Sequence, residues 1–210
     1  MPGTRFIFNT TKTIPGQTIQ LKHKGIWLSK SAGDTVVKYV LWARALLSTT
    51  IAAMSSGLSS DDKRFAERYF LTGPNGPDGG QRDTISRKLQ LTYHGLVNDV
   101  TLKLGGDGAH GFVVQRGNNF GALHVSKKTL LLGNELGVIT LMHEASHKFA
   151  LTEDGDAGQS GPDSEEMGYR RQADNDWWRA GLTQVLALNN ADSYAYFAYR
   201  VGTAHGVTGP

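Results

Sequence analysis

The chain of 210 residues is long enough for one domain with a substantial core, and its 39% hydrophobic and 20% charged residues are ordinary for a globular protein. We therefore expect a single domain over residues 1–210. The absence of cysteine excludes a disulfide-stabilised scaffold. The formal net charge is only +3 and the basic residues are scattered along the chain, so we expect no nucleic-acid partner.

The N-terminal segment, residues 1–33, is predicted to be β-like or irregular, with short strands at residues 6–8 and 19–21. It contains no apolar run of the kind that forms the core of a signal peptide. We therefore expect the protein to be cytoplasmic when it is synthesised, and its export would need a dedicated secretion system.

Helical patterns follow at residues 34–56, 61–71 and 82–103. The first is the most apolar, but it contains Lys38 and Arg44, so we expect a buried helix and not a membrane span. Serine and aspartate residues before the second helix are typical of a helix start, and the glycine- and proline-rich run after it indicates a loop.

The second half of the chain is predicted to combine a small sheet with further helices. Strands are expected at residues 112–115, 122–125 and 129–132, within and after a glycine-rich stretch. The helices expected in this half cover residues 134–150, 164–187 and 190–201, followed by a frayed end. The fold class that follows is α+β, mostly helical with a small β-sheet.

The most informative motif is His143-Glu144-Ala145-Ser146-His147, a complete His-Glu-x-x-His pentad in an apolar helical segment. Residues four apart lie on the same face of a helix, so both imidazoles can bind one metal ion, and zinc favours such nitrogen ligands. Glu144 occupies the position of the general base of zinc-dependent peptide hydrolysis. The pentad therefore predicts a zinc site on this helix.

A catalytic zinc site needs a third protein ligand, which here must come from beyond the helix. The acidic loop over residues 150–158 offers carboxylates and no histidine. His124, on a predicted strand, is interpreted as a histidine of the core or of the pocket and not as a ligand.

Three runs of residues occur together in the order of one metallopeptidase family. They are His143-Glu144-x-x-His147, Thr152-x-Asp154 and Asn190-Ala191-Asp192-Ser193-Tyr194. The combination resembles the aspzincins, the family of deuterolysin and peptidyl-lysine metalloendopeptidase, over about residues 60–201. The pentad alone is shared by many families, but the pentad with the Asn-Ala-Asp-Ser-Tyr run is much more specific. The resemblance implies a zincin-like fold whose active-site helix carries the pentad.

The resemblance also implies a ligand set. His143, His147 and Asp154 would bind Zn²⁺, and Glu144 would act as the general base. Asp156 stays open as an alternative third ligand, because a short glycine-rich loop does not determine which carboxylate points inward.

Two further roles follow from the same resemblance. The family has a tyrosine that donates a hydrogen bond to the developing oxyanion, and Tyr169 takes this role if residues 155–168 are an insertion. Asp192 is expected to accept a hydrogen bond from a ligating histidine, or to line the substrate pocket together with Tyr194. A helix N-cap is the alternative role for Asp192.

The sequence departs from the family pattern at several positions. Leu151 replaces the glycine before the threonine, and Ala157 stands where the loop tyrosine would be. Ala195 replaces an acidic residue of the lysine-specific members, which argues against strict lysine specificity. Family members are typically secreted and disulfide-bonded, whereas this chain has no cysteine.

The function expected is that of a zinc metalloendopeptidase acting on a protein or peptide substrate. Two alternatives are a zinc amidase that acts on cell-wall peptide and a non-catalytic zinc-binding module. A cysteine-free version of a usually secreted fold also suggests an effector or toxin, for which a cognate inhibitor or immunity protein would be the expected partner.

Overall fold

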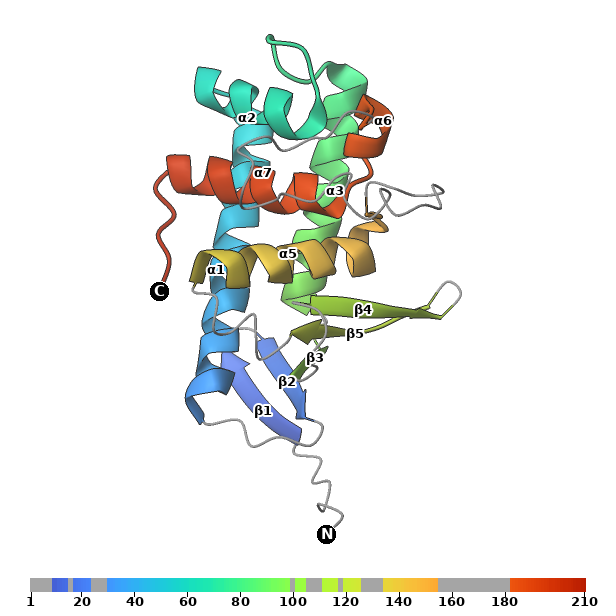
Figure 1. Ribbon diagram of the computed structural model, residues 1–210. Coiled ribbons are helices and arrows are strands. Elements are labelled where there is room, and N and C mark those ends of the chain that lie inside the picture. Colours follow the sequence, from blue (N-terminus) through green and yellow to red (C-terminus); the bar gives the residue numbers. More distant parts are fainter. Residues whose placement is uncertain are drawn as a thin grey trace.

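The computed structural model describes most of the chain as helices above a small sheet (Figure 1). The described residues are 9–14, 17–23, 30–98, 101–104, 111–116, 119–125, 134–154 and 182–210. The helices are α1 (Lys30–Ser56), α2 (Ser60–Phe70), α3 (Gly79–Asn98), α5 (Asn134–Ala150), α6 (Gln184–Ala187) and α7 (Ala191–Ala204). The strands are β1 (Asn9–Ile14), β2 (Gln17–His23), β3 (Thr101–Leu104), β4 (Gly111–Arg116) and β5 (Asn119–Val125).

The strands form one mixed five-stranded sheet with the order β1-β2-β3-β5-β4. The outer pairs, β1 with β2 and β4 with β5, are antiparallel, whereas β3 pairs in parallel with β2 and β5. Helix α5, which carries the His-Glu-x-x-His motif, contacts β4 and β5. One side of this helix is therefore supported by the sheet, where Leu123 of β5 is fully buried.

The long helices cross one another and form the core. Figure 1 shows α1 and α3 running lengthwise, with α5 and α7 crossing them, and α5 lies between α7 and the sheet. The buried side chains are apolar at helical spacing, as the amphipathic pattern requires. The largest fully buried side chains are Tyr39, Phe70, Phe197, Leu46, Leu47, Met54, Ile85, Leu89 and Leu96.

Glycines allow these helices to approach closely at their crossings. A Cβ atom on Gly137 of α5 would lie 2.3 Å from the ring of Tyr39 in α1. A Cβ atom on Gly202 of α7 would lie 2.6 Å from Cδ2 and 3.0 Å from Cα of Leu46. Because the backbone of α1 cannot withdraw as a side chain can, Gly202 determines how near α7 lies to α1.

Helix α2 begins with a capping box that is tied to the C-terminal end of the chain. The Ser59 hydroxyl accepts from the Asp62 amide (3.2 Å), and the Ser59 amide donates to Asp62 Oδ2 (3.0 Å). His205 Nε2 donates to the same oxygen at 3.0 Å. Burial raises the pKa of the Asp62 carboxyl, but the hydrogen bonds from His205 and Ser59 outweigh it and bring the pKa below its usual value.

The predicted elements agree with much of this architecture and fail at some ends. The helix predicted over residues 82–103 is wrong at its C-terminal end, because Thr101–Leu104 forms β3, whose backbone pairs with β2 on one side and β5 on the other. The prediction of a frayed C-terminal end is also wrong, because α7 continues to Ala204 and Val207 packs against the core. Helix α1 begins at Lys30, earlier than predicted.

Other predicted elements lie outside the described residues, namely the strands at 6–8 and 129–132 and most of the helix at 164–187. No helix within the described residues combines the length and the apolar character needed to cross a membrane.

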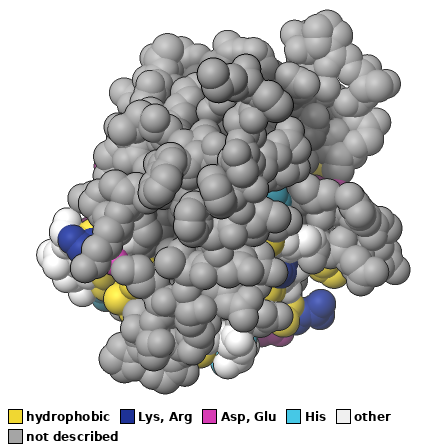
Figure 2. Space-filling model, turned by 90° about the horizontal axis from the view of Figure 1, so that it is seen from below, with side chains coloured by type: hydrophobic (Ala, Val, Ile, Leu, Met, Phe, Trp, Pro, Cys, Tyr) yellow, Lys and Arg dark blue, Asp and Glu magenta, His cyan; other side chains and the backbone are white. Residues whose placement is uncertain are grey.

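From below, at the end of the molecule where the sheet lies, the described side chains that reach the surface include hydrophobic, basic and acidic groups side by side (Figure 2).

Replacing Gly202 by alanine should lower the free energy of unfolding by about 1–3 kcal/mol, because the added methyl group overpacks the contact with Leu46. Gly79→Ala is the matched control, since nothing lies within 4 Å of a Cβ atom at that position of α3. Chemical denaturation of both variants measures the difference. Equal stability of the two variants would show that the α1–α7 crossing tolerates a wider spacing.

Replacing Asp62 by asparagine should destabilise the protein by about 1–3 kcal/mol at pH 7, because the charged acceptor of two hydrogen bonds is lost. Since the folded pKa of Asp62 is below its unfolded value, its stabilising effect is present above the unfolded pKa and is lost as the pH falls through the folded pKa. The stability gap between wild type and variant should therefore narrow in acid. Denaturation curves over a pH series test this, with exposed Asp83→Asn as control; a gap that widens in acid would contradict it.

Candidate metal centre

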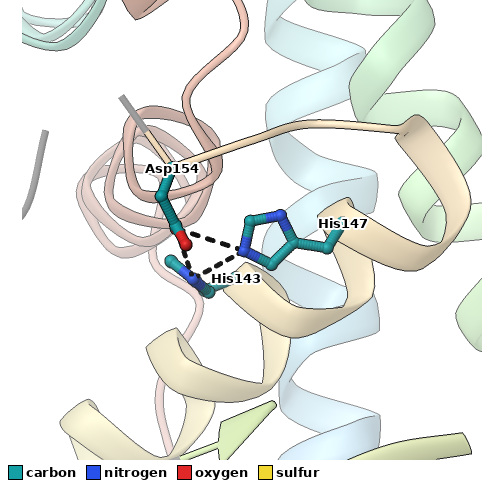
Figure 3. A group of neighbouring side chains, drawn as sticks. All are labelled: His143, His147 and Asp154. Carbon is teal, nitrogen blue, oxygen red and sulfur yellow. Dashed lines mark hydrogen bonds and ion pairs between the residues drawn. The ribbon is translucent and has the colours of Figure 1, made fainter. Parts of the chain in front are cut away.

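The two histidines of the pentad and one carboxylate converge at the C-terminal end of α5 (Figure 3). His143 Nε2 and His147 Nε2 lie 2.9 Å apart. Asp154 Oδ1 lies 3.3 Å from the first and 3.2 Å from the second of these nitrogens. The residues that follow α5 therefore bring a third potential ligand to the pair that the helical repeat had already aligned.

The other ring nitrogens are engaged outside this group. His143 Nδ1 donates to Asp192 Oδ1 at 2.5 Å, and His147 Nδ1 donates to the carbonyl of Thr152 at 2.8 Å. In the neutral rings, these hydrogen bonds place the proton on Nδ1 and leave the lone pair on Nε2.

Three electron-rich atoms thus face one another, two Nε2 lone pairs and one carboxylate oxygen. Asp154 Oδ1 is buried and faces the two Nε2 atoms. Such an arrangement is unfavourable without a positive charge between the three atoms, and it matches the nitrogen and oxygen ligands that zinc prefers. The residues therefore fit a metal ion.

The electrostatics of the site also favour a cation. Burial lowers the pKa of His143, but the carboxylates of Asp192 and Asp154 act in the other direction and raise it well above its usual value. Burial raises the pKa of Asp154, whereas the two imidazoles lower it to a value far below its usual range. The cluster thus retains its carboxylate charge and stabilises positive charge on its ligand atoms.

A sharp reversal of the chain after α5 brings Asp154 back over the histidines. Leu151 has a left-handed backbone conformation (φ 53°), and the Thr152 amide donates to the Ser146 carbonyl at 3.3 Å. The hydroxyls of Ser146 and Thr152 are hydrogen-bonded at 2.7 Å, and the Ser146 hydroxyl donates to the carbonyl of His143 at 2.8 Å. Ser146 and Thr152 are both buried, so this reversal is part of the packed structure.

The loop after α5 is also paired with the start of α7. The Glu153 amide donates to the Asn189 carbonyl (2.8 Å), and the Ala191 amide donates to the Glu153 carbonyl (2.9 Å). One short bridge therefore aligns the residue before Asp154 with the residues before Asp192. Consequently, the potential third ligand and the carboxylate that orients His143 are held in one substructure.

Glu144 lies beside this cluster with only 5% of its surface exposed. Burial raises the pKa of its carboxyl above the usual value, and the adjacent imidazoles of His143 and His147 act to lower it. Asp154 and Asp192 also interact with its charge, which places Glu144 in the same electrostatic environment as the candidate ligands.

Of the other predicted site residues, Asp192 contacts the cluster, Tyr194 lies in the core, and two are outside the described part. Asp192 accepts from His143, whereas the N-cap of α7 is Asn190. Tyr194 lies in the core, where its ring packs on Phe70 and its hydroxyl donates to the Leu188 carbonyl at 2.7 Å. Asp156 and Tyr169 are not among the described residues.

Two supporting residues were missed by the sequence reasoning. Ser146 is a variable position of the pentad pattern, but a serine on the buried side of an apolar helix is itself a signal of a polar partner. Lys88 of α3 is half-buried and donates through Nζ to Asn189 Oδ1, next to the bridge between the loop and α7. No local pattern could have indicated that contact, because it joins residues 101 positions apart.

His124, on β5, does not belong to the group of candidate ligands found among the described residues, which consists of His143, His147 and Asp154. Its neighbour Leu123 is fully buried. Since successive side chains of a strand point to opposite faces of the sheet, His124 is on the face opposite to that of Leu123.

The fold defined by these elements is similar to that of a known metallopeptidase. A zinc peptidase from Grifola frondosa has a similar structure, with a TM-score of 0.57 and 14% sequence identity, over 86% of this chain and 100% of that chain. No protein-family model matches the sequence, and no curated protein is significantly similar to it. The similarity is thus one of fold.

Metal affinity should fall in a defined order when the carboxylates are replaced. We expect Asp154→Asn to have the largest effect, because it removes an inner oxygen ligand, and Asp192→Asn to weaken binding about 10–100-fold through the orientation of His143. Asp83→Asn, on the exposed surface of α3, should have no effect. Competition with a chromogenic chelator measures all three, and unchanged affinity of Asp154→Asn together with a loss in Asp156→Asn would favour the other carboxylate.

Proposed function

We propose that the chain is a zinc-dependent metalloendopeptidase of the aspzincin type. The observation that carries the proposal is the convergence of His143 Nε2, His147 Nε2 and Asp154 Oδ1, with the buried Glu144 alongside. The fold similarity to a zinc peptidase supports it independently of the motif. Three protein ligands are also the number found in catalytic zinc sites, which keep one position for water or substrate.

Each polar residue of the site then has a part in peptide hydrolysis. Zinc, when bound, supplies a Lewis acid that polarises the scissile carbonyl and makes water more acidic. Glu144 accepts the proton of the attacking water and passes it to the leaving amine. Asp192 and the Thr152 carbonyl hold the two imidazole rings in the tautomer that presents Nε2 to the metal.

The proposal extends to the oxyanion donor and to specificity on the basis of the family resemblance. Tyr169 is our candidate for the tyrosine that stabilises the developing oxyanion. Strict lysine specificity is not proposed, because Ala195 occupies the position of an acidic residue in the lysine-specific members, and Ala195 is fully buried here. The proposed substrate is thus a protein or peptide without a required lysine.

Glu144→Gln should abolish peptide hydrolysis, with a loss of about 10²–10⁴-fold or more, because the variant keeps the metal ligands and lacks the base. The assay is digestion of a denatured protein mixture followed by mass spectrometry of the products. A chelator arm should abolish cleavage by the wild type, and the termini of the products define the preference. Glu135→Gln, at an exposed position in the first turn of the same helix, is the matched control and should leave hydrolysis unchanged.

The outcomes separate the proposed function from its alternatives. Cleavage that persists in Glu144→Gln would contradict the assigned base. Wild-type protein that binds one zinc ion tightly and cleaves no protein would favour a non-catalytic zinc module, unless it cleaves cell-wall peptide, which would identify an amidase.

A further inference from the structure

A concave site lies between α2 and α7, apart from the metal centre. It is a cavity of about 630 Å³, within the size range of ligand pockets. Its lining includes Arg64, Phe65, Arg68 and Tyr69 of α2 and Arg200 and Thr203 of α7. Arg200 follows Asp192 by eight positions on α7, which corresponds to about 12 Å along the helix axis. The cavity is therefore separate from the proposed peptidase site.

The charge of this cavity has one sign. Among the described residues that line it, three are arginines and none is acidic. Arg64 and Arg68 are four positions apart on α2 and therefore share one face of the helix, while Arg200 approaches from α7. Converging guanidinium groups bind phosphate and carboxylate groups well, because their planar donors match two oxygens at once.

Neighbouring carboxylates offset part of this charge, but they do not block the arginines described here. Asp61 pairs with Arg64, but both side chains are largely exposed, with 61% and 76% of their surface accessible, and such pairs contribute little and are easily displaced. Burial acts to lower the pKa of Arg200, but its hydrogen bond with Tyr69 and the charge of Glu135 outweigh burial and bring the pKa above its usual value. Arg200 therefore stays charged.

The wall of the cavity beside the arginines is aromatic and well supported. Tyr69 is 3% exposed, and its ring stacks on that of Tyr196 with the centroids 6.1 Å apart and the planes at 21°. Phe65 is half-buried and packs against the core. An anionic group held by the arginines would therefore lie next to a rigid apolar surface.

We infer that this cavity binds a small anionic ligand in which a phosphate or carboxylate group is attached to a flat apolar part. The guanidinium groups recognise the oxyanion, and Phe65 and Tyr69 contact the apolar part. The site is independent of metal binding and of peptide hydrolysis.

The test is calorimetric titration of the whole chain with phenyl phosphate, benzoate and inorganic phosphate at constant ionic strength, with sodium chloride as the comparison. At least one of the two aromatic anions, phenyl phosphate or benzoate, should bind. The aromatic anion that binds should do so more tightly than inorganic phosphate. The double variant Arg64→Gln, Arg68→Gln should weaken binding about tenfold or more, because charge-assisted hydrogen bonds are lost. Arg87→Gln, on the exposed face of α3, should leave binding unchanged.

Circular dichroism and zinc content should be the same in the double variant and in wild type, which separates loss of the cavity from loss of the fold or of the metal centre. The inference is overturned if neither aromatic anion binds beyond the effect of chloride. It is equally overturned if the double variant, correctly folded, binds the ligands as tightly as wild type does.

Discussion

The hydrogen bonds at the outer nitrogens of two imidazole rings are the constraint on which the site depends. Asp192 and the Thr152 carbonyl each accept from an Nδ1 atom, so that both Nε2 atoms turn toward Asp154. Without these acceptors, the rings could rotate or exchange tautomers, and the three ligand atoms would not converge. The acceptors come from two different segments, and the fold has to bring both segments to the end of α5.

The fold meets this requirement through close packing at helix crossings and through one short backbone bridge. Gly137 and Gly202 let α5 and α7 lie directly against α1, and α7 then presents Asp192 to His143. The bridge at Glu153 adds the loop to the same unit. Since interiors are densely packed, a shift at either crossing would be transmitted to the hydrogen bonds that orient the rings.

Local sequence patterns predict those parts of the molecule whose structure is determined by residues close together in the sequence. The helical repeat was enough to pair His143 with His147, and the serine and aspartate run was enough to locate the start of α2. The direction of Asp154 depends on contacts with Ser146 and on the pairing of Glu153 with Asn189. Contacts between residues far apart in the sequence produce no local pattern of residue spacing. The pairing of β3 with β2 and β5 is of this kind, and a local pattern therefore does not predict it.

Leu151 adopts an unfavourable backbone conformation in the loop after α5. A leucine in the left-handed region is disfavoured by about 1–2 kcal/mol relative to the right-handed one. Leu151 is 63% exposed, so packing of its side chain offsets little of this cost. The conformation is therefore imposed by the hydrogen bonds on either side of it. A leucine also has fewer backbone states in the unfolded chain than the glycine of the aspzincin pattern, which lowers the entropy lost on folding. The reversal at Thr152 is held by α5 itself, whereas the bridge at Glu153 needs the segment before α7, so amide exchange at Glu153 should report on the docking of α7.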